Sequence, residues 1–247
     1  MNNPFSLEGK TILVTGASSG IGRATAIECS KMGAKVVITA RNEVRLKETL
    51  DALEGDGHQM ICFDLSETDK IEDFVAQLPV LQGFVSNAGT NKMSPVNFIK
   101  EDDLNEVFKV NTFTPILLLR LLLKKKKLEK ASSVVFTSSL SGIGTVGTGN
   151  GTYASSKGAL SMFMKVAALE LASKQIRVNA VCPGMVQTQM IQEGEVAEQL
   201  EKGLVDYPLG RYGEPNDIAY AIIFLLSNAS SWVTGTNMII DGGLTIR

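Results

Sequence analysis

The sequence predicts an α/β fold in which helices cover both faces of a doubly wound, parallel sheet of about seven strands. Short runs rich in β-branched residues, such as residues 10–15 and 35–40, alternate with longer helical patterns. The strand runs are apolar on both faces, as expected for strands that are buried between two helical layers. No low-complexity linker or repeat divides the chain, so we expect a single domain over residues 1–247.

The expected elements alternate along the chain. The first strand leads into a helix at residues 21–32, and the second leads into a helix at residues 43–53. A polar, charge-rich segment at residues 187–207 separates the sixth strand from the last helix. The other strands are expected at residues 60–63, 83–86, 133–137, 177–181 and 238–240, and the other helices at residues 68–78, 101–127, 153–173 and 216–226.

The composition excludes several classes of function. A net charge of −2 and an aromatic content of 6% offer neither the basic field nor the stacking surfaces of a nucleic-acid-binding protein. Cys29, Cys62 and Cys182 are odd in number and widely spaced among apolar or small neighbours, which indicates buried thiols rather than a disulfide framework or a metal site. Residues 1–8 show no secretory signal. We therefore expect no bound metal and a cytoplasmic location.

No segment predicts a membrane protein. The longest apolar stretch, residues 116–123, is interrupted by Arg120 and is too short to cross a bilayer. The lysines at positions 124–127 follow it, and we expect them to complement the dipole of the last helical turn and to stay solvated.

A glycine-rich turn at residues 15–22 connects the first strand to the first helix. Gly16, Gly20 and Gly22 would leave the unpaired N–H groups of the first helical turn open to a pyrophosphate. The spacing Gly-x-x-x-Gly-x-Gly differs from the more common dinucleotide fingerprint. On this turn alone, a phosphate cradle and a plain strand-to-helix corner are almost equally supported.

Several polar or glycine-containing motifs follow strands and should meet at one edge of the sheet. In doubly wound sheets, ligands bind beyond the carboxyl ends of the strands. The motifs are the glycine turn, Asp64, Asn87-Ala88-Gly89, Ser138-Ser139 and Pro183-Gly184.

With these motifs in place, the chain resembles the short-chain dehydrogenase/reductase family over essentially its whole length. The resemblance implies a Rossmann-type fold and an NAD(P)-dependent oxidoreductase. It rests on seven motifs in family order, namely Thr15-Gly-x-x-x-Gly-x-Gly22, Asn87-Ala-Gly89, Asn111, Ser139, Tyr153-x-x-x-Lys157, Pro183-Gly184-x-Val186-x-Thr188 and Asp241-Gly242-Gly243.

Tyr153 and Lys157 are four residues apart on a predicted helix, so their side chains share one face. The ordinary pKa of tyrosine, about 10, is too high for efficient proton transfer near neutral pH, and a nearby ammonium lowers it. We therefore expect Lys157 to lower the pKa of Tyr153.

The resemblance implies four catalytic roles. Tyr153 protonates a carbonyl oxygen, Ser139 hydrogen-bonds that oxygen, Lys157 tunes Tyr153 and holds the nicotinamide ribose, and Asn111 supports a water-mediated proton relay. Ser138 and Ser141 stay open as alternatives to Ser139.

The end of the second strand predicts the choice of cofactor. Ala40 stands where an acidic residue would favour NAD(H), and Arg41 follows it. A guanidinium can grip a 2′-phosphate, so we expect NADP(H) to be preferred and NAD(H) to be possible. Arg41 could also be a solvated residue at a helix start, and Asn42 and Glu43 could tolerate NAD(H).

By resemblance, the remaining cofactor contacts come from four segments. Asp64 could alternatively be an acid at a helix N-terminus, where Ser66 is a competing cap. His58 lies away from all these motifs and is assigned no catalytic role. The expected contacts are Gly16, Ser18, Ser19, Gly20, Ile21, Gly22, Asp64, Leu65, Asn87, Ala88, Gly89, Pro183, Gly184, Val186 and Thr188, besides Arg41, Tyr153 and Lys157.

Two helical regions are more apolar than one buried face requires, through Leu117, Leu118, Leu119, Leu121 and Leu122 in one and Leu160, Met162, Phe163, Met164 and Leu169 in the other. With the resemblance, this predicts a homodimer or homotetramer.

The leading interpretation is an NADPH-dependent reductase of a ketone, most similar in pattern to 3-oxoacyl-[acyl-carrier-protein] reductases. A lid at residues 189–207 would set specificity. A sugar, steroid or xenobiotic carbonyl is the alternative substrate, and a catalytically idle NADP-binding regulatory protein is the alternative class.

Overall fold

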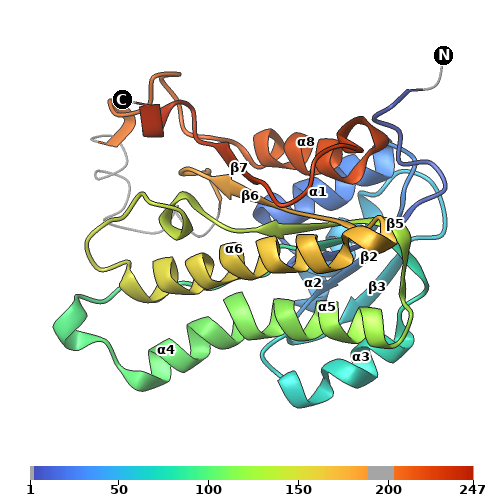
Figure 1. Ribbon diagram of the computed structural model, residues 1–247, viewed down its shortest axis with the longest axis horizontal. Helices are drawn as coiled ribbons and strands as arrows, with labels where there is room; N and C mark the ends of the chain where they lie inside the picture. The colour runs from blue at the N-terminus through green and yellow to red at the C-terminus, as the bar shows by residue number, and fades with distance from the viewer. Residues whose placement is uncertain (1–2, 189–202, 247) are drawn as a thin grey trace.

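The structure, a computed structural model, describes residues 3–188 and 203–246. Seven strands in these residues form one sheet with the order β3-β2-β1-β4-β5-β6-β7, and every neighbouring pair is parallel (Figure 1). The predicted doubly wound fold is therefore confirmed. The strands are β1 (Thr11–Thr15), β2 (Lys35–Ala40), β3 (Gln59–Cys62), β4 (Leu81–Ser86), β5 (Leu128–Thr137), β6 (Arg177–Pro183) and β7 (Asn237–Ile240).

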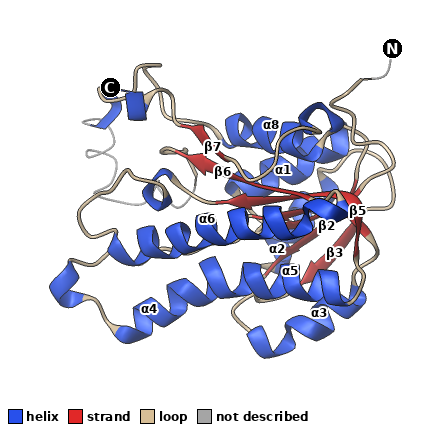
Figure 2. Ribbon diagram, viewed as in Figure 1, coloured by secondary structure: helices blue, strands red, loops and turns tan. Residues whose placement is uncertain are grey.

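Helices lie on both faces of the sheet, as Figure 2 shows in blue against the red strands. One face carries α1 (Gly20–Lys31), α2 (Glu43–Asp51) and α8 (Pro215–Leu226), which share a buried apolar cluster with the sheet. The other face carries a second cluster, formed with helices from the middle of the chain. Those helices are α3 (Ile71–Gln77), α5 (Thr114–Lys124) and α6 (Gly151–Leu171), and α4 (Glu101–Phe108) packs against α6.

Side chains that alternate along each central strand pack into the two clusters in turn. In β1, Ile12 and Val14 pack on the side of α1 and α8, whereas Leu13 packs on the side of α5 and α6. Because successive side chains of a strand point to opposite faces, a strand covered on both sides must be apolar throughout. This is the physical reason for the continuous apolar runs in the sequence.

The strand order reverses direction between β1 and β4, which are direct neighbours although β2 and β3 lie between them in the chain. A crevice forms at such a switch point, outside the carboxyl ends of the two strands. The glycine turn follows β1, and Asn87-Ala88-Gly89 follows β4. The topology thus brings the first two predicted motifs to the place where doubly wound proteins bind ligands.

The single helix predicted over residues 101–127 is wrong in its middle and at its end. A π-helical turn, Lys109–Phe113, separates α4 from α5, and the side chain of Asn111 within it is fully buried. Such turns occur mostly within helices and often at functional sites. The widened turn carries Asn111 toward the carboxyl edge of the sheet.

Two expectations about side chains are also wrong. Lys127 is not a solvated residue of the last turn, because α5 ends at Lys124 and the Lys127 Nζ donates hydrogen bonds to the carbonyl oxygens of Ala76 and Leu78. It therefore caps the end of α3. Cys62 is exposed at the end of the edge strand β3, whereas Cys29 and Cys182 are buried as predicted.

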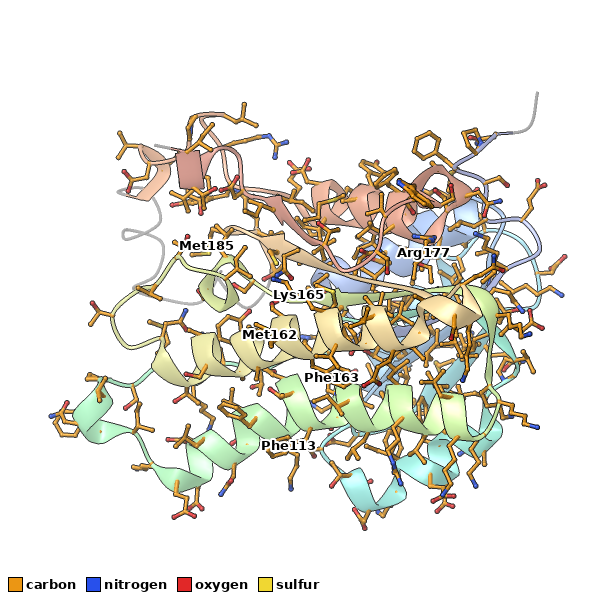
Figure 3. All side chains as sticks on the ribbon, viewed as in Figure 1. Phe113, Met162, Phe163, Lys165, Arg177 and Met185 are labelled. Atoms are coloured by element: carbon orange, nitrogen blue, oxygen red, sulfur yellow. The ribbon has the colours of Figure 1, made fainter. Side chains whose placement is uncertain are left out.

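Most of the apolar side chains of α5 and α6 that the sequence predicts to contact a partner chain are buried within this chain instead. Leu118, Leu119, Leu121, Leu122, Leu160 and Met164 are buried within the chain itself and need no partner. Other side chains of this region point outward, and Figure 3 labels Phe113 and Met162 among them. Within residues 3–188 and 203–246, no helix has the length and hydropathy needed to cross a membrane.

Candidate functional site

The glycine turn packs directly against the segment that follows β4. Gly16 and Gly20 have positive φ values of 66° and 52°, which L side chains rarely adopt. A Cβ on Gly16 would lie 2.8 Å from the Cα of Ala88, and a Cβ on Gly22 would lie 2.3 Å from the carbonyl oxygen of Gly16. Glycine is therefore required both by backbone conformation and by close approach.

Thr15 fixes the two segments to each other. Its Oγ1 accepts hydrogen bonds from the backbone N–H groups of Asn87, at 3.0 Å, and Ala88, at 3.2 Å. The Asn87 Nδ2 returns a longer bond, 3.5 Å, to the carbonyl oxygen of Gly16. The two segments at the switch point are thus held together by side-chain contacts as well as by strand pairing.

The first turn of α1 offers its backbone donors to a ligand. Ser19 occupies the N-cap position without a capping hydrogen bond from its side chain, and Gly20 begins the helix. A Cβ on Gly20 would lie 3.1 Å from the Cγ2 of Thr188, so residues 20 and 188 meet across the site. Uncapped N–H groups at the positive end of a helix dipole suit a phosphate.

Three serines at or near the end of β5 have different partners. The Ser139 side chain lies close enough to the Tyr153 hydroxyl to lower the pKa of Tyr153, and the Ser139 hydroxyl accepts from the Ser141 N–H at 3.2 Å. The Ser138 hydroxyl is buried and bonds to the Lys157 carbonyl oxygen and to the Ser161 hydroxyl, whereas the Ser141 hydroxyl accepts from the Asn150 amide. Ser139 is the only one of the three whose side chain lies close to the Tyr153 hydroxyl among the contacts of the described residues.

Lys157 lies one helical turn beyond Tyr153 and is 3% exposed. Its Nζ donates a hydrogen bond of 2.7 Å to the carbonyl oxygen of Thr137 and lies 5.7 Å from the centre of the Tyr153 ring. A Cβ on Gly89 would be 3.4 Å from this Nζ. The ammonium therefore lies between the end of β5 and the segment that follows β4.

Asn111 connects the loop after β4 to the helix that carries Tyr153. Its Oδ1 accepts from the Thr90 N–H at 2.8 Å, and its Nδ2 donates to the Thr90 carbonyl oxygen at 2.9 Å and to the Ser156 hydroxyl at 3.0 Å. The Ser156 hydroxyl in turn donates to the Tyr153 carbonyl oxygen at 2.7 Å. All four predicted catalytic residues thus belong to one connected site.

Comparisons with known proteins agree with this geometry. A short-chain dehydrogenase family model, described as enoyl-(acyl carrier protein) reductase, matches residues 16–245. The chain belongs to the short-chain dehydrogenase/reductase family. It is 35% identical to a 3-oxoacyl-[acyl-carrier-protein] reductase of Rickettsia prowazekii over 97% of this chain and 98% of that protein.

Solved structures in the family are similar over almost the entire chain. A candidate 2-deoxy-d-gluconate 3-dehydrogenase of Agrobacterium tumefaciens with bound NADP is 33% identical, covers 100% of both chains and gives a TM-score of 0.87. The Pseudomonas aeruginosa RhlG/NADP active-site complex is 30% identical, covers 99% of both chains and gives a TM-score of 0.89. The predicted family, its Rossmann-type fold and its class as an NAD(P)-dependent oxidoreductase are confirmed.

The residues that the sequence predicts to bind the adenosine, Arg41 and Asp64, follow the ends of β2 and β3. Arg41 is exposed directly after β2, and Asn42 rather than Arg41 caps α2, because the Asn42 side chain accepts from the Arg45 N–H. The Asp64 carboxylate accepts from the Ser66 N–H at 2.9 Å and forms a turn. Neither Asp64 nor Ser66 caps the next helix, since Glu67 occupies the N-cap position of the short helical turn that follows.

The pKa of Tyr153 differs from the prediction. Burial raises the pKa of Tyr153, while the nearby Ser139 side chain opposes that rise. Burial also lowers the pKa of Lys157 to about 8. The expected lowering of the pKa of Tyr153 by Lys157 is therefore wrong in this structure, because desolvation of the phenol is the largest influence on that pKa and the Lys157 ammonium is bonded to the Thr137 carbonyl oxygen.

Replacing Lys157 with Met is expected to stabilise the protein while it removes activity. The ordinary lysine pKa is 10.5, so the unfolded chain binds more protons than the folded chain between about pH 8 and pH 10.5, and wild-type stability rises with pH through that window. Below pH 8 the buried ammonium carries its full desolvation cost. We expect Lys157→Met to raise the free energy of unfolding by about 1–2 kcal/mol at pH 7, after the loss of one hydrogen bond, and by less at pH 10.

Urea unfolding at both pH values measures this effect. Lys165→Met is the matched control, because Lys165 is on the same helix but is exposed (Figure 3). A Lys157→Met variant that is less stable than wild type at pH 7 would contradict the argument.

Sequence reasoning missed three side chains that build the site. The sequence indicates Thr15 only as the start of a glycine motif, Ser156 only as a residue between Tyr153 and Lys157, and Tyr207 only as the end of the predicted lid. Ser156 lies within the Tyr153-x-x-x-Lys157 motif and carries a hydroxyl, so the motif itself was the available signal. Thr15 and Tyr207 act through backbone N–H groups, which leave no pattern in a sequence.

Proposed function

We propose that this short-chain dehydrogenase is an NADPH-dependent reductase that interconverts a ketone and a secondary alcohol. The observation that carries the proposal is that the Ser139 side chain lies close to the Tyr153 hydroxyl, and that the buried Lys157 ammonium lies 5.7 Å from the Tyr153 ring, at the sheet edge that also carries the glycine turn. A tyrosine and a serine hydroxyl can together bind and protonate one carbonyl oxygen.

The residues of the chain fit a dinucleotide cofactor. The glycine turn is a cradle that a Cβ would fill, and the uncapped start of α1 suits the pyrophosphate. Arg41 would bind the 2′-phosphate, Asp64 and Leu65 the adenine edge, Asn87 to Gly89 the adenosine ribose, and the segment from Pro183 to Thr188 the nicotinamide carboxamide. When bound, NADPH supplies a hydride to the carbonyl carbon. Two structural relatives with NADP support this choice of cofactor.

The chain's own residues complete the reduction with a proton. Tyr153 gives its phenolic proton to the carbonyl oxygen, and Ser139 donates a hydrogen bond that keeps the oxygen in place. Lys157 would hold the nicotinamide ribose, and the proton would be restored to Tyr153 from solvent by way of Lys157 and a water molecule held near Asn111. The hydrogen bonds from Asn111 through Ser156 to the Tyr153 carbonyl oxygen hold the reacting helix turn in place.

The substrate class is tested with wild-type protein and a panel of carbonyl compounds. NADPH oxidation is followed with an acetoacetyl thioester, a keto-sugar acid, a steroid ketone and a small aromatic ketone. We propose the 3-oxoacyl thioester because the relative from Rickettsia carries that activity in its name. Preference for the sugar acid would favour the alternative suggested by the Agrobacterium structure. Absence of turnover with every ketone, together with tight NADPH binding, would favour a regulatory protein.

Arg41→Ala is expected to weaken NADPH binding about tenfold or more and to change NADH binding by less than about twofold. Arg41 is exposed and its hydrogen-bond donors can meet a 2′-phosphate, which NADH lacks. Fluorescence titration with the two cofactors measures the ratio. Arg45→Ala, one turn into α2, is the matched control. Equal losses for the two cofactors would contradict a role in reading the 2′-phosphate.

We also propose that one domain spans residues 1–247, that residues 189–207 form a substrate lid, and that the protein works in the cytoplasm. Residues 189–202 of that lid lie outside the described residues. A homodimer or homotetramer is supported by large apolar side chains that α6 and the π-helical turn before α5 expose, with exposed fractions of 50% for Phe113, 61% for Met162 and 80% for Leu169. Light scattering measures the assembly.

A further inference from the structure

The segment from residue 203 to residue 213 lies against the turn after β6. The Tyr207 hydroxyl accepts a hydrogen bond of 3.0 Å from the backbone N–H of Met185. The backbone N–H of Gly213 donates to the carbonyl oxygen of Met185 at 3.0 Å. Both backbone groups of Met185, which Figure 3 labels, are thus bound by this one segment.

The Tyr207 ring is held on several sides. It is 8% exposed, and a Cβ on Gly184 would lie 3.5 Å from its Cε1. A Cβ on Gly242, which has a positive φ of 62°, would lie 3.3 Å from its Cδ1. The ring also makes an edge contact with Tyr212, at 4.9 Å between centres. Side chains at 184 and 242 would narrow the space that the ring fills.

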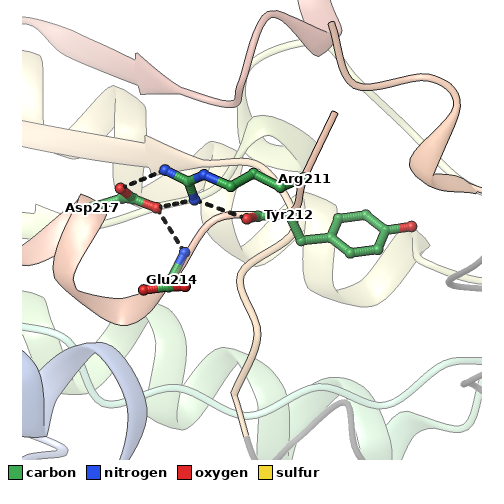
Figure 4. A network of polar contacts seen from close by, with 4 residues as sticks. All are labelled: Arg211, Tyr212, Glu214 and Asp217. Atoms are coloured by element: carbon green, nitrogen blue, oxygen red, sulfur yellow. Dashed lines mark hydrogen bonds and ion pairs between the residues drawn. The ribbon is translucent and has the colours of Figure 1, made fainter. Parts of the chain in front are cut away.

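An ion pair anchors the same segment to α8. Arg211 donates two hydrogen bonds to the carboxylate of Asp217, at 2.7 and 3.0 Å, and Asp217 also accepts from the Glu214 N–H (Figure 4). Gly213, between them, pairs with Val186, and its carbonyl oxygen accepts from Gln187. Gly213, which bonds to Met185, is therefore held in place next to the start of α8.

We infer that Tyr207 is a positioning residue that holds the segment from Pro183 to Thr188 in the shape that receives the nicotinamide. The inference rests on the proposed function, because that segment is the one proposed to bind the carboxamide. A backbone N–H needs an acceptor, and Tyr207 supplies one from a rigid ring rather than from water. Without it, the backbone that carries Val186 and Thr188 can rotate at Met185.

Tyr207→Phe tests the inference, because it keeps the ring and removes only the acceptor oxygen. We expect the dissociation constant of NADPH to rise about three- to tenfold, which corresponds to the loss of one hydrogen bond. The dissociation constant of 2′,5′-ADP, which carries the adenosine and its 2′-phosphate but no nicotinamide, should stay unchanged. Tyr220→Phe is the matched control, since Tyr220 is 55% exposed on α8.

Hydrogen exchange of the ligand-free protein gives a second readout, and the Met185 amide should exchange faster in Tyr207→Phe than in wild type. Unchanged NADPH binding with unchanged Met185 exchange would overturn the inference. Equal weakening of NADPH and 2′,5′-ADP would also overturn it, because it would indicate a general loss of structure. A wild-type protein that binds no NADPH would instead refute the proposed function and this inference with it.

Discussion

Tyr153→Phe is expected to lower kcat for ketone reduction by about 10²- to 10⁴-fold, the usual contribution of a positioned general acid. The dissociation constant of NADPH should change by no more than about threefold, because phenylalanine keeps the ring and loses a single hydroxyl contact. Tyr153 is the residue whose hydroxyl meets Ser139, and its burial raises its pKa, so the phenol is protonated at neutral pH and has a proton to give. Single-turnover rates and cofactor titrations separate the two effects.

The neighbouring serines supply a matched pair for this prediction. Ser139→Ala removes the hydroxyl that lies close to Tyr153, whereas Ser141→Ala removes a hydroxyl that accepts from Asn150. We expect a loss of about 10²-fold in kcat for the first variant and less than about threefold for the second. Equal rates in wild type and Tyr153→Phe would refute the mechanism, and a larger loss in Ser141→Ala would move the carbonyl site away from Ser139.

The fold could be predicted because its signals are local. Apolar runs such as residues 35–40 must be buried on both faces, and the structure places β2 over that same range. The four-residue spacing of Tyr153 and Lys157 places both on one helix face wherever that helix packs. Glycines in a strand-to-helix turn predict that other atoms approach the backbone closely. In this structure, atoms of Ala88 and Asn87 are among those that approach it.

The features that could not be predicted depend on distant backbone groups. Lys127 reaches the carbonyl oxygens at the end of α3, and Lys157 reaches that of Thr137. Every residue has such a carbonyl, so the sequence does not show which of them a lysine will meet. The pKa of Tyr153 could not be predicted from the sequence either. It depends on how deeply the ring is buried, and the distance in sequence from Lys157 does not give that burial.

Gly22→Ala is expected to lower the free energy of unfolding by about 3 kcal/mol or more and to abolish tight NADPH binding. The new Cβ would lie 2.3 Å from the Gly16 carbonyl oxygen and 2.5 Å from the Asn87 Nδ2. Gly22 is in the first turn of α1 and is buried, so its neighbours cannot move outward into solvent. Relief would have to come from the backbone of the glycine turn itself.

That movement separates the two segments that Thr15 holds together, because the Gly16 carbonyl oxygen is also the acceptor of the Asn87 amide. The cradle and the end of β4 should therefore be damaged together, and stability and cofactor affinity should fall in the same variant. Gly147→Ala is the matched control, since a Cβ there meets no atom within 4 Å. Urea midpoints measure the stability of both variants, and NADPH titrations measure their affinity for the cofactor. If Gly22→Ala unfolds and binds as Gly147→Ala does, the glycine turn is only a corner between strand and helix.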